Sequence, residues 1–91
     1  MYTIEFSKKS LKDLKVLNKN KKLLHKAEGI IREISEDPYS SNYKFEYLKH
    51  NLSGFCSKQL DKKYRVIYKV VDNEVIVIMV SCPRALRRSV K

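Results

Sequence analysis

Cationic and aromatic side chains are interleaved through the second half of the chain, a combination suited to holding nucleic acid. The cations of this region are Lys44, Lys49, Lys58, Lys62, Lys63, Arg65, Lys69, Arg84, Arg87, Arg88 and Lys91, and the interleaved aromatic residues are Tyr43, Phe45, Tyr47, Phe55, Tyr64 and Tyr68. Cations bind the phosphates of single-stranded RNA, and aromatic faces stack on its unpaired bases. The aromatic residues could equally belong to a hydrophobic core. The pattern alone therefore leaves RNA binding and core packing equally open.

The chain is strongly basic as a whole, with 20 Lys and Arg residues against 10 Asp and Glu residues and a formal net charge of +10. Eight lysines lie between residues 8 and 26, where Asp13 is the one acidic residue. Such an excess attracts polyanions, which include nucleic acid, an anionic membrane surface and an acidic protein partner. A surface charged only for solubility is the alternative explanation.

The two cysteines, Cys56 and Cys82, do not form a metal-binding pattern, because no CxxC pair or Cys/His pair accompanies them. We therefore expect no metal and no other cofactor. We also expect the two thiols to be reduced, which favours a cytoplasmic protein. The first residues are too short an apolar run for a signal peptide. No stretch approaches the roughly 20 apolar residues that a membrane span requires, so we expect no membrane partner.

Two helices are predicted after a short strand at residues 2–6. Ser7 can cap the first helix, and Asp37-Pro38 ends the second, because the residue before a proline is disfavoured in the helical region. Apolar residues of the first helix recur at threefold spacing, at Leu11, Leu14 and Leu17. Those of the second recur at spacings of three and four, at Leu23, Leu24, Ala27, Ile30, Ile31 and Ile34. We expect an antiparallel helix hairpin with Leu24 and Ile31 in its core.

The second half of the chain is predicted to form strands. Residues 39–54 are expected to be irregular, and strands are expected at 55–60, 64–71 and 74–82. Asp72-Asn73 joins the last two as a hairpin turn, since both side chains tolerate positive φ. We therefore predict a single α+β domain over residues 1–91, with an N-terminal strand and an antiparallel helix hairpin that packs on a mostly antiparallel sheet of four strands in all.

Residues 46–70 contain two recognisable runs: the chain reads EYLKHNLSGFCSKQL from residue 46 and YRVIYKV from residue 64. These runs resemble the YoeB/Txe branch of the RelE toxin superfamily. The family pattern is approximately E-x-L-K-x-x-L-x-G-x-x-S-R-R-I, followed by H-R-L-V-Y-x-V. The stretch LKHNLSGF is especially similar, and the resemblance implies the RelE-like microbial RNase fold.

The resemblance also implies an activity and its partners. The toxin would cleave mRNA in the ribosomal A site, through attack of a 2′-hydroxyl on the adjacent phosphate, and a cognate antitoxin would neutralise it. Operator DNA would be bound only together with the antitoxin, and a homodimer is left open. Glu46 matches the glutamate that would act as general base, and Arg65 matches the phosphate-binding arginine. The structural alternative for Glu46 is a surface carboxylate paired with a lysine. The structural alternative for Arg65 is an ion pair within the sheet.

Four further cations are candidate RNA or phosphate contacts: Lys49, Lys58, Arg84 and Arg87. Lys58 stands at the first arginine of the family's Ser-Arg-Arg run, and Gln59 replaces the second. YoeB-like chains end in a Cys-x-Tyr-His-Tyr type sequence, whereas this chain has Ala85 and Leu86 where the histidine and the last tyrosine would stand. An arginine stabilises a phosphorane but does not readily donate a proton, so the general-acid role is unfilled.

Three hypotheses follow from these residues. The first is a ribosome-dependent endoribonuclease whose acid role is met by a cation or by water. The second is a catalytically weakened relative that binds the ribosome, RNA or antitoxin, and inhibits translation or acts as a co-repressor without cleavage. The third is a basic interaction module whose main ligand is the acidic tail of an antitoxin. Glu46 and Arg65 favour the first hypothesis, and the departure at Ala85 favours the second.

Overall fold

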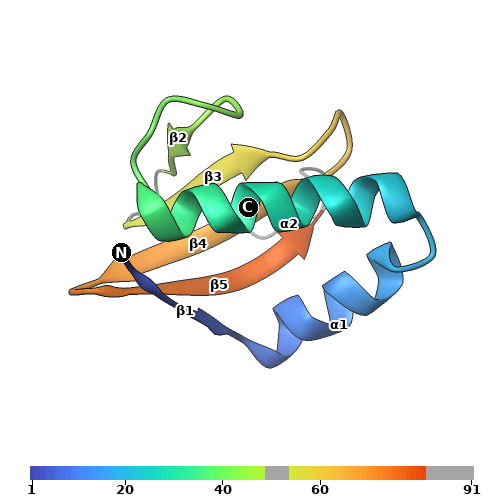
Figure 1. The fold of residues 1–91 in the computed structure, drawn as a ribbon, viewed down its shortest axis with the longest axis horizontal. Coiled ribbons are helices and arrows are strands. Elements are labelled where there is room, and N and C mark those ends of the chain that lie inside the picture. Colours follow the sequence, from blue (N-terminus) through green and yellow to red (C-terminus); the bar gives the residue numbers. More distant parts are fainter. Residues whose placement is uncertain (49–53, 82–91) are drawn as a thin grey trace.

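The computed structural model describes residues 1–48 and 54–81 of the chain. Its elements, in chain order, are β1 (Thr3–Phe6), α1 (Lys8–Leu17), α2 (Lys21–Glu36), β2 (Glu46–Tyr47), β3 (Phe55–Gln59), β4 (Arg65–Val71) and β5 (Glu74–Ser81). The strands form one sheet in the order β1-β5-β4-β3-β2, with β1 parallel to β5 and the other pairs antiparallel. In Figure 1, α2 crosses one face of this sheet and α1 lies beside it. The predicted α+β class is confirmed.

The strand count differs from the prediction by one. The sheet has five strands, because residues 46–47, which were expected to be irregular, pair with β3. A two-residue strand carries no readable alternation of apolar and polar residues, so its pairing is invisible in the sequence.

Capping residues and a proline define the helix boundaries, and of the two N-terminal caps Ser7 was predicted. The Ser7 hydroxyl accepts a hydrogen bond from the Ser10 amide at 3.0 Å and satisfies a free donor of the first turn of α1. Asn20 caps α2 in the same way through the Leu23 amide, at 3.3 Å. The helix then ends at Glu36, immediately before Asp37-Pro38.

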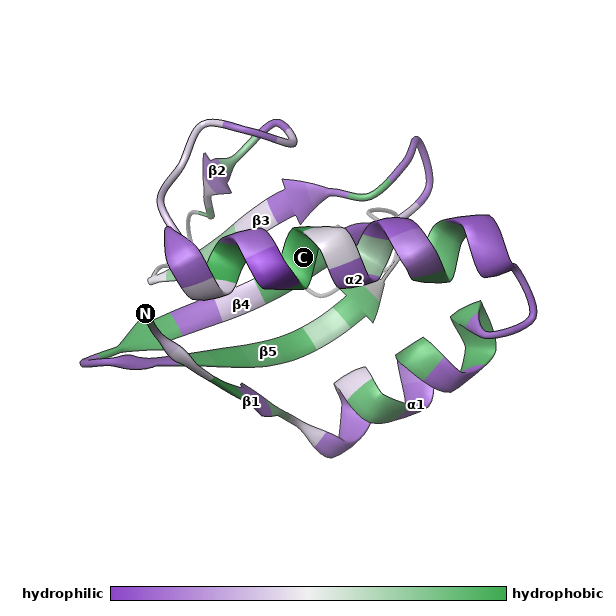
Figure 2. Ribbon diagram, in the orientation of Figure 1, coloured by the Kyte–Doolittle hydropathy of each residue, from purple (hydrophilic) through white to green (hydrophobic). Residues whose placement is uncertain are grey.

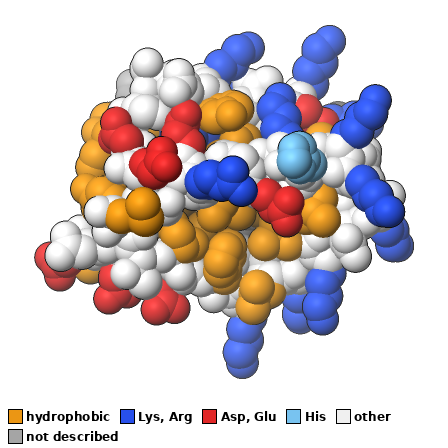
Figure 3. All heavy atoms as spheres, in the orientation of Figure 1, with side chains coloured by type: hydrophobic (Ala, Val, Ile, Leu, Met, Phe, Trp, Pro, Cys, Tyr) orange, Lys and Arg blue, Asp and Glu red, His pale blue; other side chains and the backbone are white. Residues whose placement is uncertain are grey.

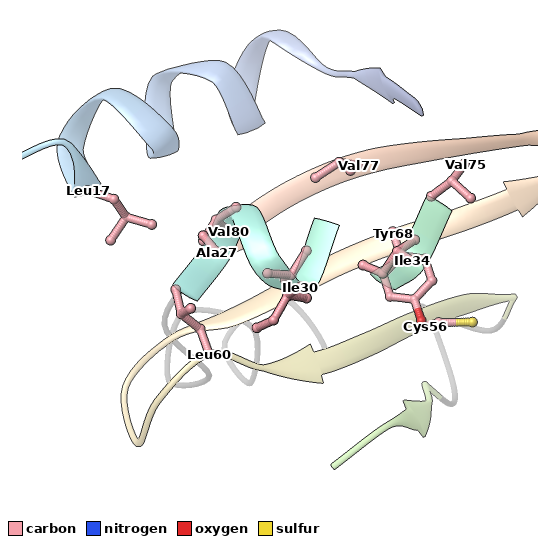
Figure 4. Packing of buried hydrophobic residues seen from close by; sticks show 11 residues of the cluster. Leu17, Ala27, Ile30, Ile34, Cys56, Leu60, Tyr68, Val75, Val77 and Val80 are labelled. Atoms are coloured by element: carbon pink, nitrogen blue, oxygen red, sulfur yellow. The ribbon is translucent and has the colours of Figure 1, made fainter. Parts of the chain in front are cut away.

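The core lies between the helices and one face of the sheet. Figure 4 shows its side chains converging from α1, α2, β3, β4 and β5. The buried cluster consists of Leu17, Ala27, Ile30, Ile34, Cys56, Leu60, Val66, Tyr68, Val75, Val77 and Val80. In Figure 2, β5 is largely hydrophobic, and it lies inside the sheet between β1 and β4. Leu24 and Ile31, which were predicted as core residues, are only half-buried, and Ile30 and Ile34 take the central positions.

Strand alternation determines which side chains lie on the other face of the sheet. Cys56 and Leu60 of the β3 segment belong to the core cluster, so Lys58, which lies between them, points to the helix side as well. Ser57 therefore lies on the opposite face. Glu46 is the cross-strand partner of Ser57, and so it shares that face.

Candidate active site

The structure brings together the two residues that were predicted to be catalytic. Arg65 Nη2 lies 3.4 Å from Glu46 Oε1, although 18 residues separate the two in the sequence. Glu46 projects from β2 and Arg65 from the start of β4, with β3 between the two strands. The Glu46 side chain is 54% exposed and that of Arg65 is 20% exposed, so both can meet a ligand from solvent.

A third side chain orients the arginine. Arg65 Nη1 donates to the Ser57 hydroxyl at 3.2 Å, and Ser57 itself is fully buried. A guanidinium has five N–H donors in a planar fork, so Arg65 can keep this contact and still offer donors to a phosphate. Sequence reasoning missed the role of Ser57, because its alignment with Glu46 follows from the unforeseen pairing of β2 with β3.

This arrangement of Glu46, Ser57 and Arg65 suits acid–base chemistry on a phosphodiester. The exposed carboxylate can accept a proton, and the neighbouring guanidinium can hold an anionic oxygen. Without substrate the two groups pair with each other, as an exposed ion pair of modest strength. A phosphate that takes over the guanidinium would release the carboxylate for proton transfer.

Lys58 is the predicted phosphate contact that the structure corrects. Its side chain is fully buried, and its Nζ donates to Ser40 O at 2.9 Å, to Asn42 O at 2.9 Å and to Ser40 Oγ at 3.0 Å. Glu33 Oε1 lies 3.0 Å away as its counter-ion. Burial alone would raise the pKa of Glu33, but hydrogen bonds from Asn42, Ser40 and Lys58 outweigh it and lower the pKa. An ammonium so enclosed, on the helix side of the sheet, is not available to a phosphate bound by Arg65.

The other predicted RNA contacts, Lys49, Arg84 and Arg87, lie outside the described residues. The same holds for Ala85 and Leu86, where the family carries its histidine and tyrosine. Their predicted roles stay predictions.

The aromatic residues divide into core and surface. Tyr68 is fully buried, and its hydroxyl donates to the Pro38 carbonyl. Tyr39, Phe45 and Tyr47 instead form a cluster with ring centroids 4.9–6.4 Å apart. Tyr47 is the cross-strand partner of Cys56, so this cluster lies on the helix side of the sheet, opposite the face that carries the Glu46 carboxylate. Tyr39 and Tyr47 are 47% and 62% exposed, so their faces could stack on bases. Tyr39 had been overlooked because no cation is adjacent to it in the sequence.

The charges of the surface are polarised. All eight lysines of the helix hairpin are exposed. Exposed acidic residues gather toward the opposite end, on β1, at the end of α2 and around the β4–β5 turn: Glu5, Glu36, Asp37, Asp72 and Glu74. In Figure 3 most acidic side chains lie on the left, and the lysines lie toward the right, top and bottom. A polyanion would meet the hairpin end and be repelled by the other.

A metal-binding cluster and a membrane-spanning helix are both absent from residues 1–48 and 54–81. No three His, Cys, Asp or Glu side chains there are grouped so that they could hold a metal ion. No helix in this part of the chain has the length and apolar character needed to cross a membrane.

Comparison with known proteins places the chain in a family. A model described as the YoeB-like toxin of bacterial type II toxin–antitoxin systems matches residues 6–83. A toxin YoeB of Synechocystis is 36% identical over 59 residues, which are 65% of this chain and 69% of that protein. A heterotetrameric YoeB–YefM toxin–antitoxin complex of Staphylococcus aureus contains a similar chain, with a TM-score of 0.78, 28% identity, and coverage of 89% of this chain and 95% of that one. A YoeB dimer of the same species gives a TM-score of 0.78 at 28% identity, over 88% of this chain and 94% of that one.

The matched residues contain both helices, strands β2 to β5 and the Glu46–Arg65 pair. The predicted resemblance is confirmed: this chain belongs to the YoeB-like toxin family of bacterial type II toxin–antitoxin systems.

Proposed function

We propose that this toxin cleaves mRNA in the ribosomal A site. The observation that carries the proposal is the 3.4 Å approach of the Glu46 carboxylate to the Arg65 guanidinium on one face of the sheet. A proton acceptor and a phosphate-binding cation are the two groups that attack by a 2′-hydroxyl needs first. Family membership supports the same kind of reaction.

In the proposed reaction Glu46 removes the proton from the 2′-hydroxyl, and the resulting oxygen attacks the adjacent phosphorus. Arg65 holds the non-bridging oxygens as negative charge develops on them. The bond from phosphorus to the 5′-oxygen then breaks, and that oxygen takes a proton from water or from a group held by a neighbouring cation. The products are a 2′,3′-cyclic phosphate and a 5′-hydroxyl end.

The partners follow from the charge and from the family. The hairpin lysines would face the ribosomal RNA and the acidic end would point away from it, while Lys49, Arg84 and Arg87 would contact the RNA backbone near the reaction. A cognate antitoxin would neutralise the toxin, in analogy with the YoeB–YefM complex. We further propose that operator DNA is bound only with the antitoxin, that a homodimer forms as in the S. aureus YoeB dimer, and that the protein acts in the cytoplasm.

Controlled expression tests the proposal in cells. The wild-type chain, Glu46→Ala and Arg65→Ala are induced separately, and mRNA ends are mapped by primer extension. New ends inside translated codons that disappear in both variants are the expected result. Growth arrest without new ends would contradict cleavage and favour binding without chemistry.

A weakened, non-cleaving toxin is the second candidate, and the absence of the family's histidine at Ala85 is the observation in its favour. Such a chain would inhibit translation by occupying the ribosome, or act with its antitoxin as a co-repressor. Ala85→His separates the two candidates. A sharp rise in toxicity would identify the natural chain as an impaired enzyme, whereas no change would mean that another group already serves as the acid.

A further inference from the structure

We infer that Lys58 is a positioning residue for Glu46: its buried ammonium fastens the segment that carries the carboxylate to the sheet. This inference rests on the proposed function, because it assigns to Glu46 the role of general base. Lys58 itself touches neither RNA nor the reacting atoms. It acts through the path of the backbone from Ser40 to Glu46.

The ammonium is held by a closed set of oxygens. Three come from the segment after α2, namely the carbonyls of Ser40 and Asn42 and the Ser40 hydroxyl, all within 3.0 Å. The fourth belongs to Glu33 of α2, which also accepts hydrogen bonds from Ser40 and Asn42 at 2.8 and 2.7 Å. Lys58 thus joins β3, α2 and this segment at one buried point.

The fastened segment turns directly before Glu46. Tyr43 and Lys44 both adopt left-handed backbone conformations, with φ of 57° and 51°. Non-glycine residues persist in this region only where surrounding contacts hold them. The Gln59 amide holds this turn through the Tyr43 carbonyl at 2.6 Å, and the Phe45 ring lies 5.2 Å from Lys58 Nζ.

The strand that presents Glu46 has little support of its own. β2 contains two residues, and its register is defined by two cross-strand pairs with β3 and by the hydrogen bond from the Leu48 amide to the Phe55 carbonyl. A short edge strand of this kind depends on what anchors its ends. The Lys58 anchor lies on the N-terminal side of β2, so its loss would let the Glu46 carboxylate drift relative to Arg65.

A direct electrostatic role for Lys58 does not fit the geometry. Its charge is neutralised by Glu33 and lies on the helix side of the sheet, whereas Glu46 and Arg65 meet on the other side. Misplacement of a reacting group by about 1 Å can cost on the order of 100-fold in rate. Loss of the anchor should therefore lower the rate of the chemical step and leave the affinity for the ribosome nearly unchanged.

The test compares Lys58→Met with Tyr68→Phe in cleavage of ribosome-bound mRNA, at temperatures where both variants are folded. Tyr68→Phe is the matched control, because it removes another buried tether of the same connection at Pro38, farther from Glu46. We expect Lys58→Met to lower kcat by about 10- to 100-fold with KM within about threefold, and Lys58→Arg to recover most of the rate. Tyr68→Phe should stay within about threefold of the wild type.

Several results would overturn the inference. The first is an unchanged kcat in Lys58→Met. The second is a change confined to KM, which would indicate that Lys58 contacts RNA. The third is an equal loss of kcat in Tyr68→Phe, which would indicate general destabilisation. If Lys58→Met does not fold, Glu33→Gln serves in its place, and we expect the same direction with about a three- to tenfold loss of kcat. An unchanged kcat there would count equally against the anchor.

A second readout needs no activity. Amide hydrogen exchange should accelerate at least about tenfold at Gln59 and Leu48 in Lys58→Met, while β4 and β5 stay protected. Unchanged exchange would refute the anchor even in a protein that cleaves. If the wild type does not cleave at all, the proposed function fails, and the exchange result still decides whether Lys58 holds this segment.

Discussion

Replacement of Glu46 by glutamine should separate a catalytic carboxylate from a structural ion pair. Glutamine keeps the volume of the side chain and its ability to accept a hydrogen bond from Arg65, but it is a far weaker base. The pair spans 3.4 Å and Glu46 is 54% exposed, so solvent screens the attraction, and such pairs contribute about 0.2–1 kcal/mol. Since 1 kcal/mol corresponds to about 4–8 °C in a domain of this size, the melting temperature should fall by less than about 8 °C.

The expected effect on cleavage is much larger. Loss of a general base commonly lowers the rate by about 10²–10⁴-fold, which is about 3–5 kcal/mol in the activation barrier. Melting is followed by circular dichroism and cleavage on programmed ribosomes. Glu28→Gln, at an exposed position of α2, is the control for a change of one charge. A stability loss above about 2 kcal/mol together with a rate within tenfold of the wild type would refute the catalytic reading and favour the structural one.

Three further predictions concern side chains that are buried or half-buried. Ile30→Ala should destabilise the fold by about 2–5 kcal/mol in chemical denaturation, because it opens a cavity at a fully buried position, whereas half-buried Ile31→Ala should cost less; equal losses would contradict the packing. The pKa of Glu33 is lower in the native protein than in the unfolded chain, so its ionisation stabilises the fold. This stabilisation is complete above the unfolded pKa of about 4.3 and is lost as the pH falls through the native pKa of Glu33. Glu33→Gln should therefore flatten the acid side of a curve of stability against pH. Burial raises the pKa of the Cys56 thiol, so in a Cys82→Ser background a thiol reagent at neutral pH should label the native protein far more slowly than the unfolded protein.

The regular elements could be predicted because their signals are local. Ser7 and Asp37-Pro38 mark helix ends through capping and through the restriction before proline, and both predictions are confirmed. The spacing of apolar residues in α2 identified the buried side of the helix. It did not distinguish Ile30, at the centre of the core, from Ile31 at its margin, because adjacent residues differ by only about 100° around the helix.

The site was less predictable, because it depends on pairing between strands. The family pattern led to Glu46 and Arg65, but their approach requires β2, which is too short to leave a signal in the sequence. Lys58 was misassigned although a signal existed. Cys56 and Leu60 lie two positions before and after Lys58, and both are apolar. Residues two positions apart on a strand share a face, so this spacing places Lys58 on the buried face. Lys58 was predicted to contact phosphate because it aligns with an arginine of the family pattern, although its apolar neighbours at positions 56 and 60 indicate burial.

The chemical identity of the RNA ends tests the central claim most directly. Purified toxin is added to ribosomes that hold a defined mRNA, and the fragments are analysed by mass spectrometry in parallel with Glu46→Gln and Arg65→Lys. We predict a 2′,3′-cyclic phosphate on the upstream fragment and a 5′-hydroxyl on the downstream fragment, with both products reduced at least about 100-fold in the variants. Intact mRNA, fragments with a 5′-phosphate, or cleavage that persists in both variants would contradict the assignment of Glu46 and Arg65 to attack by the 2′-hydroxyl.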